Sequence, residues 1–191
     1  MKRIIAIASA MALATILVGC TGTDASSSLQ NSDESISESS SYTSTKWATV
    51  EVSDDDISCE GLVLTALNSG DFPEMVRITD DTLLNTIMDF SQYGITDYSV
   101  YQQAISVELS EVIAVRADAA DDVYDMLMKR KTSLIKQFGT YPEQEKIVSQ
   151  TIVFKKGDLC VLIASDEPMK AEKAILNKIK ENDNNSSQKE G

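Results

Sequence analysis

The chain has 191 residues, with 17 Lys or Arg against 30 Asp or Glu, so its formal net charge is −13 at pH 7. Nucleic acid and anionic lipid repel a chain this acidic, which excludes both as partners held by charge. The chain contains no histidine. This excludes histidine-based zinc or iron sites and the Ser-His and Cys-His pairs of nucleophilic enzymes. We therefore expect no cofactor of these kinds.

Residues 1–19 have the layout of a secretory signal peptide. Lys2 and Arg3 precede an uncharged, mostly apolar stretch from Ile4 to Val18 that is too short for a permanent membrane span. The stretch runs into Leu17-Val18-Gly19-Cys20, which resembles the lipobox of bacterial lipoprotein precursors. The resemblance implies cleavage before Cys20, a diacylglycerol thioether on its sulfur, and an acyl chain such as palmitate on the new N-terminus. A plain secretory signal with a chance cysteine is the alternative.

Cleavage at this point removes Lys2, Arg3 and no acid, so 15 basic residues remain against 30 acidic ones and the formal charge becomes −15. The acyl chains must then hold the protein at the membrane without electrostatic help. Two chains suffice, because each buried CH₂ contributes about 0.8 kcal/mol. The sequence thus predicts a lipid-anchored protein on the extracytoplasmic face of the cell membrane, with the bilayer as its partner through Cys20.

Residues 20–46 predict a disordered tether, because serine dominates them and Leu29 and Ile36 are their only aliphatic residues. Residues 47–181 suit one globular domain. The polar residues 182–191 predict a disordered tail.

The domain alternates between helical and strand-like patterns. Helices are predicted after Ser53, from Asp80 to about Tyr93, from Ala119 to about Gln137, from Pro142 to about Ser149, and from Asp166-Pro168 onward. Asp118 is the predicted cap of the third helix, whose buried stripe is Val123, Leu127, Leu134 and Phe138; Ala171, Ile175 and Ile179 face inward in the last.

Four segments read as strands: 98–107, 112–115, 151–154 and 159–164, the last two joined across residues 155–158. The run Leu159–Ala164 is apolar throughout, so we expect a central strand covered on both faces. The sum is a single α+β domain, a small and mainly antiparallel sheet of about three or four strands packed against four or five helices.

Cys59 and Cys160 remain once Cys20 is lipidated. Their separation leaves a disulfide open in an exported chain. However, Cys160 lies inside an apolar strand, where a buried thiol is the default.

Several short segments between residues 54 and 166 occur in a characteristic order. They are Tyr93-Gly94-Ile95, Glu111–Val115, the Asp-rich helix with Leu127 and Arg130, Tyr141-Pro142, and Lys156-Gly157 before an apolar strand that ends in Ser165-Asp166. In this order they resemble the clostridial lipoprotein family called domain of unknown function 4358. The resemblance implies a fold and a location, and it implies no activity.

Asp121, Asp122 and Asp125 form an Asp-Asp-x-x-Asp pattern. Isoprenoid synthases hold magnesium with this pattern, but no second acidic motif accompanies it here. Carboxylates at this spacing can also share a surface calcium ion. The third interpretation is an acidic first helical turn that opposes the helix macrodipole.

Arg130 lies three residues after Leu127 and four before Leu134, on or beside the apolar stripe. A guanidinium there needs a partner, because leaving it buried and unpaired is costly. The sequence leaves two roles open: a structural ion pair or snorkelling side chain, and an anchor for an anionic ligand. Tyr98, Tyr101 and Tyr124 are candidates for a glycan-binding face, or ordinary half-buried residues.

No catalytic constellation emerges. We therefore expect a non-enzymatic, membrane-anchored module that binds an envelope protein or a small ligand. The alternative is a small envelope hydrolase that cleaves glycan with Asp or Glu carboxylates alone. A structural or export-associated lipoprotein without a ligand is the third possibility.

Overall fold

The computed structural model of the chain describes residues 47–54, 56–104 and 108–189. The chain divides into two units, Met1–Ser41 and Tyr42–Gly191, and every described residue belongs to the second. The predicted signal peptide, Cys20 and the predicted tether lie outside the described residues. Within the described part, no helix has the length and apolar character that a membrane crossing requires.

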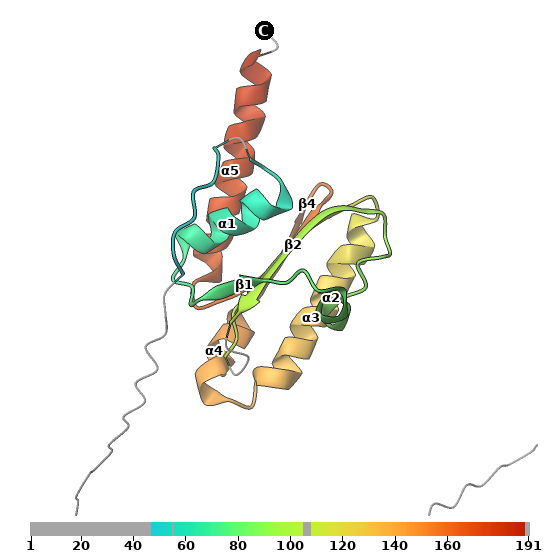
Figure 1. The fold of residues 1–191 in the computed structure, drawn as a ribbon, viewed down its shortest axis with the longest axis vertical. Coiled ribbons are helices and arrows are strands. Elements are labelled where there is room, and N and C mark those ends of the chain that lie inside the picture. Colours follow the sequence, from blue (N-terminus) through green and yellow to red (C-terminus); the bar gives the residue numbers. More distant parts are fainter. Residues whose placement is uncertain (1–46, 55, 105–107, 190–191) are drawn as a thin grey trace, which may run out of the picture. The chain divides into compact units, whose positions relative to one another are not determined.

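The centre of the fold is a five-stranded, fully antiparallel sheet (Figure 1). Its strands are β1 (Met75–Arg77), β2 (Ile95–Gln103), β3 (Glu111–Ala117), β4 (Ile152–Lys156) and β5 (Leu159–Ala164), in the order β1-β2-β3-β5-β4. The α+β prediction is confirmed, but the sheet has five strands and not the predicted three or four, and β1 is the strand that the sequence did not predict. β1 has only three residues, two of them exposed, and so carries no alternation that a sequence pattern reveals.

Five helices accompany the sheet in the described residues: α1 (Cys59–Ser69), α2 (Asp81–Ile87), α3 (Ala120–Phe138), α4 (Pro142–Gln150) and α5 (Pro168–Lys189). One apolar cluster joins α1 and α5 to one face of the sheet, and a second joins α2, α3 and α4 to the other. The result is a helix–sheet–helix arrangement with the core split between the two faces (Figure 1).

The elements with continuous apolar patterns form as predicted. The α3 stripe of Val123, Leu127, Leu134 and Phe138 is buried, and so are the inward residues of α5. β5 is buried at all six positions and lies between β3 and β4, which confirms the predicted central strand. The β4–β5 turn places Gly157 at φ +63°, a conformation that glycine adopts without strain.

Two helix starts differ from the prediction. α1 begins at Cys59 and not after Ser53, because Asp56 accepts hydrogen bonds from the backbone and hydroxyl of Ser58, and Ser58 Oγ then caps Gly61 N at 3.1 Å. Asp118 does not cap α3. The N-cap is Ala119, which has no side-chain capping bond, and the Asp118 side chain packs against Gly94, where an added Cβ would lie 2.8 Å from its carboxylate.

Other boundaries move at the ends of elements. The predicted strand 98–107 becomes β2, which ends at Gln103, and residues 105–107 lie outside the described residues. The polar segment from Asn182, expected as a disordered tail, continues α5 to Lys189. Within these last turns the hydroxyls of Ser186 and Ser187 donate to the carbonyls of Asn182 and Asp183, four residues earlier.

Cys59 and Cys160 are free, buried thiols. Cys59 belongs to the apolar cluster under α1 and α5, and Cys160 to the cluster under α3 and α4, so the sheet separates them. The disulfide that the sequence left open is therefore not formed.

Candidate functional site

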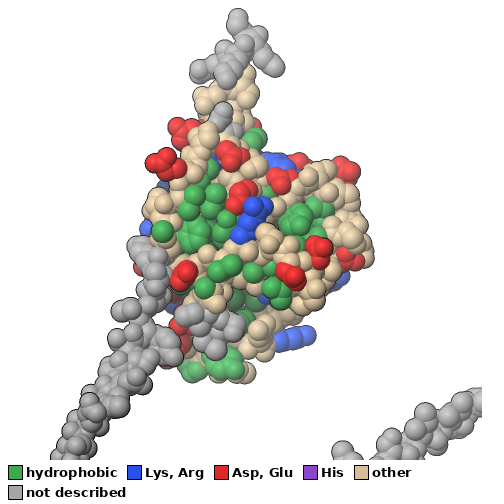
Figure 2. All heavy atoms as spheres, in the orientation of Figure 1, with side chains coloured by type: hydrophobic (Ala, Val, Ile, Leu, Met, Phe, Trp, Pro, Cys, Tyr) green, Lys and Arg blue, Asp and Glu red, His purple; other side chains and the backbone are tan. Residues whose placement is uncertain are grey.

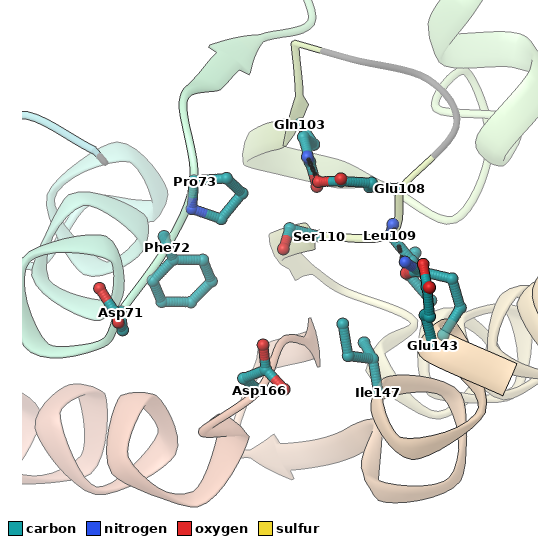
Figure 3. Close-up of a pocket in the computed structure, with 11 residues that line it drawn as sticks. Asp71, Phe72, Pro73, Gln103, Glu108, Leu109, Ser110, Glu143, Ile147 and Asp166 are labelled. Atoms are coloured by element: carbon teal, nitrogen blue, oxygen red, sulfur yellow. Dashed lines mark hydrogen bonds between the residues drawn. The ribbon is translucent and has the colours of Figure 1, made fainter. Parts of the chain in front are cut away.

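A hollow with a polar lining lies at one end of the sheet, where β2 ends and β3 begins. The register pairs Gln102 with Glu111, and Glu111 with Ala164, so the end of β5 lies at the same place. The hollow has a volume of about 560 Å³. It is lined by Asp71, Phe72, Pro73, Gln103, Glu108, Leu109, Ser110, Glu143, Gln144, Ile147 and Asp166, and is called the acidic pocket below (Figure 3).

Apolar packing and one buried hydrogen bond fix the walls of the acidic pocket. Phe72, Leu109 and Ile147 are buried. Gln144, in the first turns of α4, accepts a hydrogen bond from Leu109 N at 2.8 Å through its side-chain oxygen. This bond holds the segment before β3 against α4. Phe72 O accepts a hydrogen bond from Trp47 N at 2.9 Å, which fixes the segment after α1.

Four carboxylates line the acidic pocket: Asp71, Glu108, Glu143 and Asp166. Figure 3 shows them spaced around the opening on four different segments of the chain. Glu108 accepts a hydrogen bond from the Gln103 amide, and Asp166 pairs with the exposed Lys146 at 3.1 Å. No Lys or Arg is among the described residues that line the pocket. The interior therefore has a negative potential, and Figure 2 shows that acidic side chains are otherwise spread over the visible face.

Ser110 lies between these carboxylates and is only 6 % exposed. Its hydroxyl points into the pocket in Figure 3, and it has no hydrogen-bond partner among the residues that the structure describes. The one buried side-chain oxygen without a partner in the described residues is Ser165 Oγ, so the Ser110 hydroxyl, which is not in that class, is open to the solvent in the pocket. Ser110 therefore offers a donor and an acceptor to whatever enters the pocket.

Arg130 lies in an adjoining hollow of about 320 Å³ that shares Gln103 and Glu108–Ser110 with the acidic pocket. Arg130 Nε donates to Glu111 Oε1 at 2.9 Å and Nη2 donates to Oε2 at 2.5 Å, while Gln102 Nε2 donates to Oε2 at 2.6 Å. Burial alone would lower the pKa of the guanidinium, but hydrogen bonding and charge attraction from Glu111 outweigh burial and raise that pKa.

The two ends of this ion pair are poorly accessible. The side chain of Glu111 is 2 % exposed and that of Arg130 is 13 % exposed. The pair joins α3 to the first residue of β3, directly after Ser110. Of the two roles that the sequence left open for Arg130, the observed contacts are those of the structural ion pair.

Asp121, Asp122 and Asp125 are exposed on α3, and Asp121 forms an ion pair with Lys155. Across the described ranges, no group of three His, Cys, Asp or Glu side chains is placed so that it could hold a metal ion. Asp121 and Asp122 lie in the first turn of α3, where they oppose the macrodipole.

The three tyrosines do not share one surface. Tyr101 packs with the α1 and α5 cluster and donates its hydroxyl to Glu60 at 2.7 Å, whereas Tyr98 and Tyr124 pack on the opposite face of the sheet. The Tyr98 ring contacts Phe90, with centroids 4.6 Å apart. The sheet thus divides the tyrosines, and they form no common aromatic platform.

The two buried thiols are poor nucleophiles in this fold. Burial raises the pKa of the Cys160 thiol to about 11. Burial and the neighbouring Asp97 raise the pKa of Cys59 still further. Because the thiolate is the reactive form, both cysteines are unreactive near neutral pH. Cys20, the predicted lipidation site, lies outside the described residues.

Sequence reasoning did not single out the acidic pocket. Its carboxylates stand at positions 71, 108, 143 and 166, a spacing that fits no helical or strand period. The available signal was weaker: Ser165-Asp166 follows a buried strand, and Glu143 opens a helix after Pro142. These segments come together only in the folded chain, at the end of the sheet where β2 ends and β3 begins.

The family model described as domain of unknown function (DUF4358) matches residues 68–165. The chain belongs to the DUF4358 family. The DUF4358 match runs from the end of α1 through β5, so it includes all five strands and α2, α3 and α4. It also includes every residue of the acidic pocket except Asp166, which follows it directly. No curated protein and no solved structure matches the chain.

Proposed function

We propose that this DUF4358 protein is a lipid-anchored, extracytoplasmic binding module without catalytic activity, and that its ligand occupies the acidic pocket. The observation that carries the proposal is the pocket itself. It combines a volume of about 560 Å³, within the usual range for small-ligand sites, with buried apolar walls and the Ser110 hydroxyl, which faces the interior.

The surrounding chemistry favours binding over catalysis. The chain has no histidine, its buried thiols have raised pKa values, and the buried guanidinium of Arg130 is held by Glu111. Gln144 holds the wall of the pocket in place before any ligand enters. A preformed wall reduces the ordering cost of binding.

The anchor is supported by the lipobox-like sequence that ends at Cys20. Metabolic labelling with an alkyne analogue of palmitate tests it in a host that processes lipoproteins. Wild-type chain is expected to carry the label and to fractionate with membranes, whereas Cys20→Ala is expected to lose both properties. Equal labelling of the two chains would contradict the anchor.

A photocrosslinking residue at position 143 tests the pocket in cells, and one at position 125, on the exposed face of α3, is the matched control. We expect a discrete adduct from position 143 that is absent from position 125. If the two positions give the same adducts, or if neither gives one, the pocket is not the binding site.

The glycan hydrolase remains a second candidate, because the pocket is lined by carboxylates, the residue type that glycosidases use. Incubation of the purified protein with peptidoglycan fragments separates the two candidates. Binding without release of new reducing ends is expected. Release that is lost in Glu108→Gln or Glu143→Gln would favour the hydrolase instead.

A further inference from the structure

We propose that the acidic pocket binds a small organic polycation, a flexible molecule that carries at least two ammonium groups joined by methylene segments. This inference rests on the proposed function, because it names the ligand class of the same pocket. It follows from the sign of the charges, their spacing, and the groups that lie between them.

The charges exclude an anionic ligand and favour a cationic one. Asp71, Glu108, Glu143 and Asp166 line the pocket, and no Lys or Arg does so in the described part of the chain. Lys146 pairs with Asp166 at the exposed edge of the pocket, and Glu108 and Glu143 form no ion pair with a Lys or Arg in the described part of the chain. The charges of Glu108 and Glu143 attract a cation from solution.

The spacing of the carboxylates favours an extended cation over a metal ion. A bound calcium ion needs several oxygens at about 2.3–2.6 Å from a single centre. In the described residues, no three acidic side chains are placed to share an ion in that way. The four carboxylates come from four separate segments around the opening (Figure 3). A chain with two or more ammonium groups reaches several of them at once.

The middle of the pocket suits the methylene segments that join the ammonium groups of such a ligand. Phe72, Leu109 and Ile147 supply buried apolar surface for methylene groups. Ser110 is 6 % exposed and directs its hydroxyl between the carboxylates. An ammonium or secondary ammonium group has only donors, so the lone pairs of the Ser110 hydroxyl accept from it. The Ser110 hydroxyl makes no hydrogen bond with a described residue, so its lone pairs are available for this contact.

Isothermal titration of the full-length chain in non-ionic detergent, with spermidine as the probe in 150 mM salt, tests the inference. We expect saturable binding at one site per chain. Glu108→Gln/Glu143→Gln is expected to weaken the affinity at least tenfold. Asp122→Asn/Asp125→Asn is the matched control, because it removes the same charge from exposed positions of α3, and it is expected to change the affinity less than twofold. Ser110→Ala is expected to weaken it severalfold.

Thermal melting of each variant without probe establishes that it is folded. Equal losses in the two double variants would overturn the proposal, because binding would then be counterion attraction to an acidic surface. Binding of a trilysine peptide by a chain that does not bind spermidine would show that the ligand is a basic peptide and not a small molecule. Binding of calcium that is weakened by the same variants would show that the ligand is a metal ion and not an organic cation. An adduct at position 143 without spermidine binding would leave the pocket standing and refute the ligand class; absence of both would refute the pocket as well.

Discussion

Replacing Arg130 by methionine is expected to destabilise the domain more than any exposed charge substitution. The variant keeps most of the apolar stem but removes both hydrogen bonds to Glu111, at 2.9 and 2.5 Å. The Glu111 carboxylate, whose side chain is 2 % exposed, then remains buried with only the Gln102 amide as a partner. Breaking a buried pair in this way costs about 3–5 kcal/mol.

This loss corresponds to a fall in melting temperature of about 10–15 °C for a domain of this size. Lys170→Met provides the control, because it breaks the exposed pair with Glu167, in which both side chains are about half exposed. That pair is worth less than about 1 kcal/mol. The double variant Arg130→Met/Glu111→Leu is expected to recover much of the loss, since apolar replacement of a buried ion pair is often nearly neutral.

Urea unfolding followed by circular dichroism gives the free energy of unfolding for wild type, the two single variants at 130 and 111, and the double variant. The cycle isolates the coupling between the two side chains. A loss below about 1 kcal/mol in Arg130→Met, or additive losses in the double variant, would refute the ion-pair account and reopen the role of Arg130 as a ligand anchor.

Three further outcomes are expected. In a Cys20→Ser background, Cys59 and Cys160 should react slowly with a thiol reagent at pH 8 in the native state, and both should react in denaturant without reductant; fewer than two thiols would indicate a disulfide. Burial and the hydrogen bond to Glu60 raise the pKa of Tyr101 to about 12, so its contribution to stability is complete below about pH 10 and is lost as the pH rises through 12. Tyr101→Phe should remove that part of the pH dependence, and an unchanged alkaline profile would contradict the contact. Gly157→Ala should cost about 1 kcal/mol in urea unfolding, because φ is +63° and a Cβ meets nothing within 4 Å; no loss would mean that the turn adopts another conformation.

The sequence predicts the elements whose signals are local. α3 carries an apolar stripe and an acid-to-base charge order along its length, and β5 carries six consecutive apolar residues, so each determines its own burial. β1 has no such signal. Its three residues are strand because β2 offers them a ladder, with Met75 opposite Gln103. A strand that forms because a neighbouring strand pairs with it carries no signal in its own residues.

The candidate site likewise has one residue that the sequence identifies and several that depend on the fold. Arg130 was identifiable from its place in the apolar stripe, because a charge there demands a partner. The identity of that partner, Glu111, was not, since it begins a strand that reaches α3 only in the folded sheet. Ser110 and the pocket carboxylates lie in connections between elements, where polar residues are ordinary. Their function as a group depends on the register of β2, β3 and β5.

The acidic pocket is the proposed ligand site of this protein. Two-dimensional amide NMR of the full-length chain in non-ionic detergent, titrated with spermidine, tests it most directly. We expect saturable shifts that gather at residues 71, 72, 108–110, 143–147 and 166, on the four segments that line the pocket. Shifts spread over the acidic surface, with Asp122 and Asp125 moving as much as Ser110, would contradict it.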